Sequence, residues 1–131
     1  MIEDIVGITF WTDDLSRMFH FYNDILRLPL HSKHDGFIAF QVGELRLNIG
    51  KHAEVNERSK DPYRIMANFS VSDLISTHRD MTDQGVQFIR EPEKESWGGM
   101  VATFLDPDGN ILQLLEFPSV SYTHLTLPTK A

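Results

Sequence analysis

The chain has 131 residues, of which 41% are hydrophobic and 24% charged, an ordinary composition for one soluble globular domain. It carries 19 acidic and 12 basic residues, and this acidic balance argues against a nucleic-acid partner, because phosphates require a basic surface. No signal-peptide pattern opens the chain, no apolar run could span a bilayer, and there are no cysteines. We therefore expect a cytoplasmic protein without a membrane partner, a disulfide or a thiolate zinc site.

The first 50 residues predict one βαβββ unit. A β-like run over 5–11 is followed by Asp13 and Asp14, either of which can cap a helix. Apolar residues then recur at helical spacing on one face, which indicates core packing: Leu15, Met18, Phe19, Tyr22 and Leu26. Turn signals separate three further strands, expected over 30–32, 37–42 and 45–49.

The second unit repeats this order over 64–118, after a polar linker over 51–63. We expect a strand over 64–71, a helix capped by Asp73 that reaches about Gln84, and Gly85 in left-handed geometry. A strand begins over 86–89. A long loop is then expected over 90–99, where a functional role and a merely connecting role are both open.

A hairpin closes the second unit. Residues 100–105 and 111–116 are rich in β-forming or apolar residues, and they flank Asp106-Pro107-Asp108-Gly109-Asn110. Pro107 presets φ and Gly109 accepts positive φ, so this segment predicts a tight turn. From the turn alone, a generic surface hairpin is equally plausible.

The segment over 119–131 differs from the rest of the chain. It follows Pro118, shares no periodicity with the preceding strands, and resembles the translation of a sequencing adapter. We interpret it as a non-native tail, and an authentic β tail is the alternative. The domain is therefore expected over residues 1–118.

The two units contain a shared pattern. Phe10-Trp11-Thr12-Asp13-Asp14-Leu15 and Phe69-Ser70-Val71-Ser72-Asp73-Leu74 both end a β-like run and begin a helix, and they lie 59 positions apart. The chain therefore predicts two copies of one βαβββ module, which is an α+β fold.

Paired βαβββ modules with a terminal Asp-Pro-Asp-Gly-Asn hairpin resemble the vicinal oxygen chelate superfamily, which includes glyoxalases, extradiol dioxygenases and bleomycin resistance proteins. The resemblance implies a cup-shaped mixed β-sheet with helices packed outside. Arg27 departs from it, because such chains usually place Gly there, and a left-handed Arg would cost ~1 kcal/mol. The motifs that carry the resemblance are Asp14-Leu15, Phe21-Tyr22, Ser72-Asp73-Leu74, Gly85-Val86 and the run from Thr103 to Leu114.

In metal-dependent members of that superfamily, His or Glu ligands lie on the cup wall. The matching positions in this chain hold Gly7, Asn48, Met66 and Gln113. Gly and Met do not supply the required nitrogen or oxygen donors, and neutral amides bind transition metals weakly. The histidines show no convincing ligand spacing, so we expect no metal and no other cofactor.

Strand alternation predicts a ligand-binding face that mixes polar and apolar groups. A guanidinium in a cup can hold a carboxylate or phosphate, although Arg46 could instead pair with Glu44 or Glu95. The amides could also satisfy one another in an internal network, and Trp97 could act as a lid or seal the core edge. The candidate residues are Thr9, Trp11, Arg46, Asn48, Met66, Asn68, Trp97 and Gln113.

The sequence favours a metal-independent protein that binds a small organic ligand, resembling bleomycin resistance proteins. A divergent lyase, isomerase or dioxygenase with an altered metal site is the alternative, although no general base is evident on the predicted face. A scaffold whose cup is filled by its own side chains is a third interpretation. Family members with one pair of modules dimerise, so the resemblance also implies a homodimer.

Overall fold

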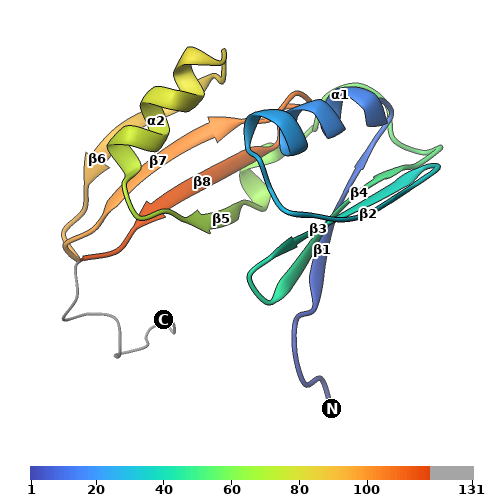
Figure 1. Ribbon diagram of the computed structural model, residues 1–131, viewed down its shortest axis with the longest axis horizontal. Helices are drawn as coiled ribbons and strands as arrows, with labels where there is room; N and C mark the ends of the chain where they lie inside the picture. Colours follow the sequence, from blue (N-terminus) through green and yellow to red (C-terminus); the bar gives the residue numbers. More distant parts are fainter. Residues whose placement is uncertain (119–131) are drawn as a thin grey trace. The chain divides into compact units, whose positions relative to one another are not determined.

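The computed structural model describes residues 1–118, and the suspected non-native tail over 119–131 lies outside the described residues. The chain folds into two compact units. The first comprises Met1–Lys60 together with Asp106–Gly109, and the second comprises Asp61–Leu105 and the described residues from Asn110 onwards. Figure 1 shows a four-stranded sheet and a helix in each. No helix within residues 1–118 is long and apolar enough to cross a membrane.

The first unit is a βαβββ module, as predicted. Its sheet has the strand order β1-β4-β3-β2, in which β1 runs parallel to β4 and the other neighbours are antiparallel. Its elements are β1 (Gly7–Thr12), α1 (Leu15–Phe19), the π-helical segment η1 (His20–Ile25), β2 (Leu30–His34), β3 (Phe37–Val42) and β4 (Leu45–Lys51).

The first helix begins after Asp14, one of the two cap candidates that the sequence offers. Asp14 caps α1 by accepting a hydrogen bond from the backbone N–H of Arg17 at 3.1 Å. The predicted continuous helix is wrong in one respect, because it changes to π-helical geometry from His20. The chain then leaves the helix at Arg27, which has a φ of 56° and confirms the left-handed non-Gly residue expected there.

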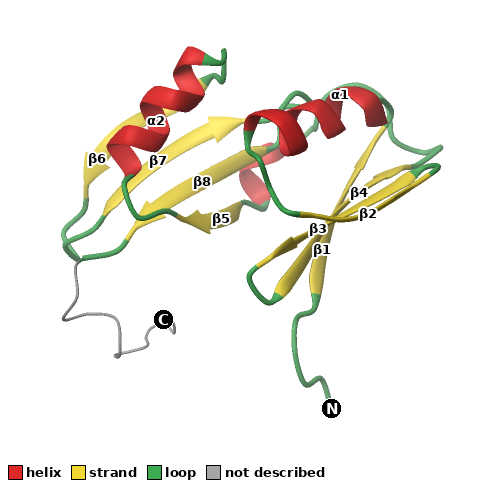
Figure 2. Cartoon of the chain, in the orientation of Figure 1, coloured by secondary structure: helices red, strands yellow, loops and turns green. Residues whose placement is uncertain are grey.

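The second unit repeats the topology in a separate sheet of order β5-β8-β7-β6. In this sheet β5 runs parallel to β8, and the other neighbours are antiparallel. Helix α2 packs against the three strands β6, β7 and β8, and Figure 2 shows it along one face of that sheet. The elements are the 3₁₀ turn η2 (Pro62–Arg64), β5 (Ala67–Ser70), α2 (Leu74–Asp83), β6 (Phe88–Lys94), β7 (Met100–Leu105) and β8 (Ile111–Glu116).

Two boundaries in the second unit differ from the sequence prediction. The strand expected from Arg64 begins only at Ala67, because Pro62 starts the 3₁₀ turn η2. The loop expected over 90–99 is also wrong, since β6 continues to Lys94. Pro92 is tolerated inside β6 because this strand is at the sheet edge and its register shifts between Arg90 and Glu93.

Each unit has its own core beneath its helix. In the first, Tyr22 and Met18 are fully buried and pack toward the strand face that carries Phe40 and Ile49. In the second, Leu74 and Met81 of α2 are buried with Phe104, Leu112 and Leu114 of the sheet. The opposite face of the first sheet is not covered by α1. It carries four of the eight residues predicted to bind a ligand, namely Thr9, Trp11, Arg46 and Asn48.

Candidate functional site

The uncovered face of the first sheet brings together four of the predicted site residues. The register of β1, β4 and β3 aligns Thr9 with Asn48 and Asn48 with Ala39. One step toward the start of β4, Arg46 lies opposite Gly7 on one side and Gln41 on the other. Because alternate residues of a strand share a face, Trp11 lies on this face too.

An open hollow of about 570 Å³ lies on this face. Its polar lining includes Arg46, Asn48, Gln41, Glu44 and Ser32, and Ala39 and Phe37 supply apolar surface. A volume of this size accommodates a small organic molecule.

Two hydrogen bonds orient the polar side chains of the hollow. The Arg46 Nε–H donates to Oε1 of Gln41, and the Asn48 amide donates to the Thr9 hydroxyl oxygen at 3.3 Å. The alternative pairing of Arg46 with Glu44 or Glu95 is wrong, since no carboxylate in residues 1–118 forms an ion pair with it.

Phe37 lines one end of the hollow, and Trp11 lies next to Phe37, outside the residues that line the hollow itself. Trp11 is 44% exposed, and its ring centroid lies 6.1 Å from that of Phe37 and 5.2 Å from that of His52. A Cβ atom added to Gly50 would lie 2.5 Å from the Trp11 ring, so the indole rests directly against the glycine backbone.

The predicted residues of the second unit form a smaller polar row. The Gln113 amide donates to Oδ1 of Asn68 at 2.9 Å, and its carbonyl oxygen accepts from the Thr103 hydroxyl at 3.3 Å. Gln113 and Asn68 therefore satisfy part of their hydrogen-bonding capacity within their own sheet, which is the internal network that the sequence left open.

The other two predicted residues of the second unit lie outside this row. Met66 precedes β5 and is 37% exposed. Trp97 lies with its ring centroid 5.7 Å from that of Phe117, and its indole lies so close to Gly99 that an added Cβ would be 2.0 Å from a ring carbon. The contacts of Trp97 are thus with the end of its own sheet.

The residues at the superfamily's metal-ligand positions do not fit a catalytic metal. Gly7 has no side chain, and a Cβ placed there would lie 2.8 Å from the backbone oxygen of Arg46, so a histidine could not enter without a backbone shift. Asn48, Met66 and Gln113 supply neutral amides and a thioether. Among the residues that the structure describes, no group of three or more His, Asp or Glu side chains could hold a metal ion.

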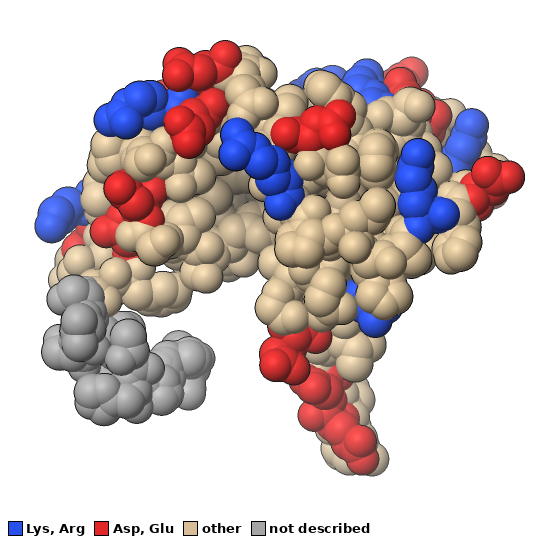
Figure 3. Space-filling view, in the orientation of Figure 1, with Lys and Arg blue, Asp and Glu red and all other residues tan. Residues whose placement is uncertain are grey.

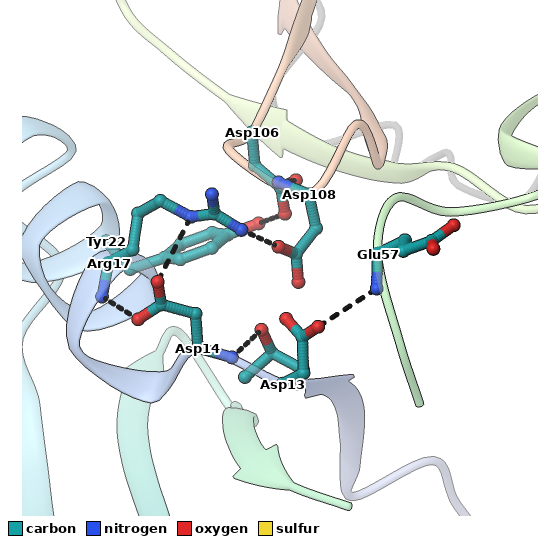
Figure 4. A network of polar contacts seen from close by, with 8 residues as sticks. Asp13, Asp14, Arg17, Tyr22, Glu57, Asp106 and Asp108 are labelled. Carbon is teal, nitrogen blue, oxygen red and sulfur yellow. Dashed lines mark hydrogen bonds and ion pairs between the residues drawn. The ribbon is translucent and has the colours of Figure 1, made fainter. Parts of the chain in front are cut away.

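The hairpin turn carries a network that sequence reasoning missed. Asp106 and Asp108 are each only 3% exposed, so this is not a generic surface turn. Figure 4 shows Tyr22 donating its phenol proton to Oδ2 of Asp106 at 2.7 Å, and Arg17 donating to Oδ1 of Asp108 at 2.8 Å. By its contacts, the turn belongs to the first unit.

The same network perturbs the titration of Tyr22. Complete burial, followed by the charge and hydrogen bond of Asp106, raises the pKa of the Tyr22 phenol well above its ordinary value. Asp106 also accepts from the backbone N–H of Asp108 at 2.9 Å, which closes the turn. These contacts position the turn, and they lie away from the hollow.

Sequence reasoning also missed part of the hollow's lining. Phe37, Ala39 and Gln41 alternate along β3, so their shared face was readable from strand periodicity. Their alignment with β4 was not readable, because register depends on long-range pairing. Glu44, in the turn before β4, also lines the hollow and supplies the carboxylate that the predicted face lacked.

Two βαβββ modules, each with a mixed four-stranded sheet, define the glyoxalase-like class of α+β proteins. The chain belongs to the Glyoxalase/Bleomycin resistance protein/Dioxygenase superfamily, whose sequence profile matches residues 4–114. It is 25% identical over 122 residues to the uncharacterized protein YraH of Bacillus subtilis strain 168, covering 84% of this chain and 95% of YraH.

Solved structures are similar to this fold. A glyoxalase/bleomycin resistance protein/dioxygenase family enzyme from Burkholderia phytofirmans superposes with a TM-score of 0.74 at 18% identity, over 87% of this chain and 98% of that one. A member of the same superfamily from Sphaerobacter thermophilus gives 0.73 at 20% identity, over 88% and 98%. At such identities the likeness shows the fold alone.

Proposed function

We propose that this protein binds a small organic ligand without a metal, in the hollow on the uncovered face of the first sheet. The observation that carries the proposal is that Arg46 and Asn48 both line this hollow, while Thr9, the register partner of Asn48 on β1, accepts a hydrogen bond from it. A hollow with a few oriented polar groups and apolar walls is the usual form of a small-molecule site.

The donor chemistry supports binding rather than metal-dependent catalysis. Gly7 and Asn48 stand on this face where metal-using relatives would present ligands, and the backbone leaves no room for a side chain at Gly7. The proposed role therefore resembles that of bleomycin resistance proteins, which sequester a ligand. A cytoplasmic location is part of this proposal, supported by the absence of cysteine from the sequence.

Binding can be tested by thermal shift and calorimetry on chelator-treated protein, with anionic, neutral and cationic organic compounds. We expect one class to raise the melting temperature of the metal-free protein, because ligand that binds only the folded state stabilises it. Arg64→Met serves as the control for Arg46→Met, since Arg64 lies on η2 and pairs with Asp61 on the surface. Stoichiometric metal in elemental analysis, with a stabilisation that chelator removes, would sink the proposal.

One observation favours the catalytic alternative, a divergent lyase, isomerase or dioxygenase. Glu44 lines the hollow beside Arg46, so a carboxylate that could accept a proton lies near a cation that could hold a substrate. Under this alternative, Glu44→Gln would abolish turnover and leave ligand affinity nearly unchanged. Turnover that survives in Glu44→Gln would remove Glu44 from consideration.

A further inference from the structure

Three successive levels of the uncovered face differ in chemistry. The first holds Arg46, the second Asn48, and the third Gly50 with its flanking rings. Alternate residues of a strand are ~6.8 Å apart, so the backbone of β4 advances ~14 Å from the charged level to the aromatic level. The face thus changes from cationic to polar to aromatic along one strand.

At the charged level, the Arg46 guanidinium is oriented so that it can bind an anion. Gln41 accepts from Arg46 through its Oε1, and its own amide donates to the backbone oxygen of Gly43 at 2.8 Å, so Gln41 is held from both ends. In residues 1–118, no hydrogen bond or ion pair occupies the two terminal nitrogens of Arg46. Two parallel N–H groups of a guanidinium match the two oxygens of a carboxylate. Glu44 at the hollow's rim is exposed, so solvent screens its repulsion of an anion.

The aromatic level depends on Gly50. Because this residue has no Cβ, the rings of Trp11 and Phe37 lie against the strand backbone, where an added Cβ would be 2.5 Å and 2.9 Å from them. Both rings remain partly exposed, at 44% and 36%. An apolar or aromatic group placed here would bury them and stack at an edge or offset angle.

The middle level can bind a further polar group. The Asn48 amide nitrogen donates to Thr9, which leaves the Asn48 carbonyl oxygen as an acceptor and the Thr9 hydroxyl proton as a donor. A ligand hydroxyl at this level could donate to the Asn48 carbonyl oxygen and accept from the Thr9 hydroxyl, whereas a ligand carbonyl could only accept from Thr9.

We propose that the ligand of this hollow is an aromatic carboxylate, with its carboxylate on Arg46 and its ring against Trp11 and Phe37. This inference rests on the proposed function and names its ligand class. Charge complementarity at one end and apolar burial at the other favour acids in which a chain separates the ring from the carboxylate, because the two levels are ~14 Å apart along the backbone of β4.

The test uses phenylacetate, phenylpropionate and phenylbutyrate, with phenylbutanol and phenylbutyramide as uncharged analogues. Trp97→Phe protein leaves Trp11 as the only indole reporter, since the chain has two tryptophans. We expect the acids to change Trp11 emission and to bind more tightly as the linker lengthens. Calorimetry should show that the acids bind at least about tenfold more tightly than the uncharged analogues. This is the difference in affinity expected when one charged hydrogen bond is lost.

Two substitutions separate the ends of the ligand. Arg46→Met should weaken binding of phenylbutyrate at least about tenfold and leave phenylbutanol unchanged, whereas Arg46→Lys should restore part of the loss. Gly50→Ala should displace the indole, shift its emission and weaken the long acids, while circular dichroism reports whether the fold persists. Phe37→Leu provides a milder version if Gly50→Ala does not fold.

The outcomes distinguish this inference from the proposed function. Neutral or cationic compounds that bind and alter Trp11 emission, with no response to the acids, would overturn the carboxylate assignment and leave metal-independent binding intact. Equal affinity of phenylbutyrate for the wild type and Arg46→Met would also overturn it. Binding of acids only after a divalent metal is added would overturn both.

Discussion

Asp106 and Asp108 lie in an environment that differs from the one their sequence context suggests. Acidic residues in a Pro-Gly turn normally face solvent, yet both are almost fully buried and accept hydrogen bonds from Tyr22 and Arg17. In the part of the chain that the structure describes, Oδ2 of Asp108 is the buried side-chain oxygen without a hydrogen-bond partner. The motif that identifies the family thus also carries a buried polar network.

Tyr22 provides a pH-dependent test of this network. Its pKa is raised in the folded protein, so the stability due to the neutral phenol is fully present below about pH 10 and is lost as pH rises toward the folded value. We predict that wild-type stability falls above about pH 10 with an added slope of up to about 1.4 kcal/mol per pH unit. Tyr22→Phe should lack that slope.

Urea denaturation at several alkaline pH values measures the effect. Tyr63→Phe is the matched control, because Tyr63 is 69% exposed on η2. At neutral pH, Tyr22→Phe should also cost about 1–3 kcal/mol, since the O–H donor to Asp106 is removed. Parallel pH profiles for wild type and Tyr22→Phe would show that the phenol does not titrate in this way.

At the level of elements, the two helices end differently although the modules repeat. After α2, Gly85 adopts a φ of 89°, which suits a residue without Cβ. After the first helix, Arg27 adopts a φ of 56°, which strains an L side chain. The π-helical segment η1 precedes this strained exit, whereas α2 keeps α-helical geometry to Asp83.

We predict that the two positions respond to substitution with opposite signs. Arg27→Gly should stabilise the protein by about 0.5–1 kcal/mol, because the left-handed conformation no longer strains a side chain. Gly85→Ala should destabilise it by about 1 kcal/mol. No atom lies within 4 Å of a Cβ added at Gly85, so this cost is conformational rather than steric. Urea midpoints at constant m value measure both, and changes of the same sign would refute the strain argument.

Strand β6 shows why its boundary was not predictable. Pro92 and the charged run around it are typical of a loop, but β6 pairs with β7 on one side only. A proline can lie in an edge strand at a bulge without breaking a ladder of hydrogen bonds. Whether a strand is at an edge depends on the complete sheet order, which local sequence does not contain.

At the level of the whole molecule, acidic residues outnumber basic ones, and on the face shown in Figure 3 basic side chains lie in separate groups.

The N-terminal segment before β1 exposes large apolar side chains, including Ile2 at 87% and Ile5 at 71%. Exposed apolar residues gathered in one segment are typical of a protein-binding surface.

We predict that the protein is a homodimer and that this segment contributes to the interface. Sedimentation equilibrium should give twice the 15.1 kDa chain mass, and Ile5→Glu should shift the equilibrium toward monomer because it places a charge in an apolar contact. Glu3→Gln is the control, since Glu3 lies on the same segment. A monomer at high protein concentration would contradict the homodimer. A dimer that Ile5→Glu leaves unchanged would contradict the role of the N-terminal segment in the interface.

Part of the candidate site could be predicted from sequence. Period-two alternation correctly placed Thr9 and Trp11 on one face of β1, and Arg46 and Asn48 on one face of β4. The partners Gln41 and Phe37 were not identified, because the pairing of β3 with β4 brings them there. Glu44 was not placed in the lining for the same reason. The ligand role of all these residues stays a prediction.

The sequence by itself determined the two βαβββ modules, the helix cap at Asp73, the choice of Asp13 or Asp14 as the first cap, and the tight turn before β8. Each depends on local preferences of a few neighbouring residues for a backbone geometry. Only the tertiary structure decided that the acidic turn is buried and that the levels of Arg46, Asn48 and Gly50 form one face. Burial and strand register depend on residues far apart in the chain, and they decide which side chains a ligand could meet.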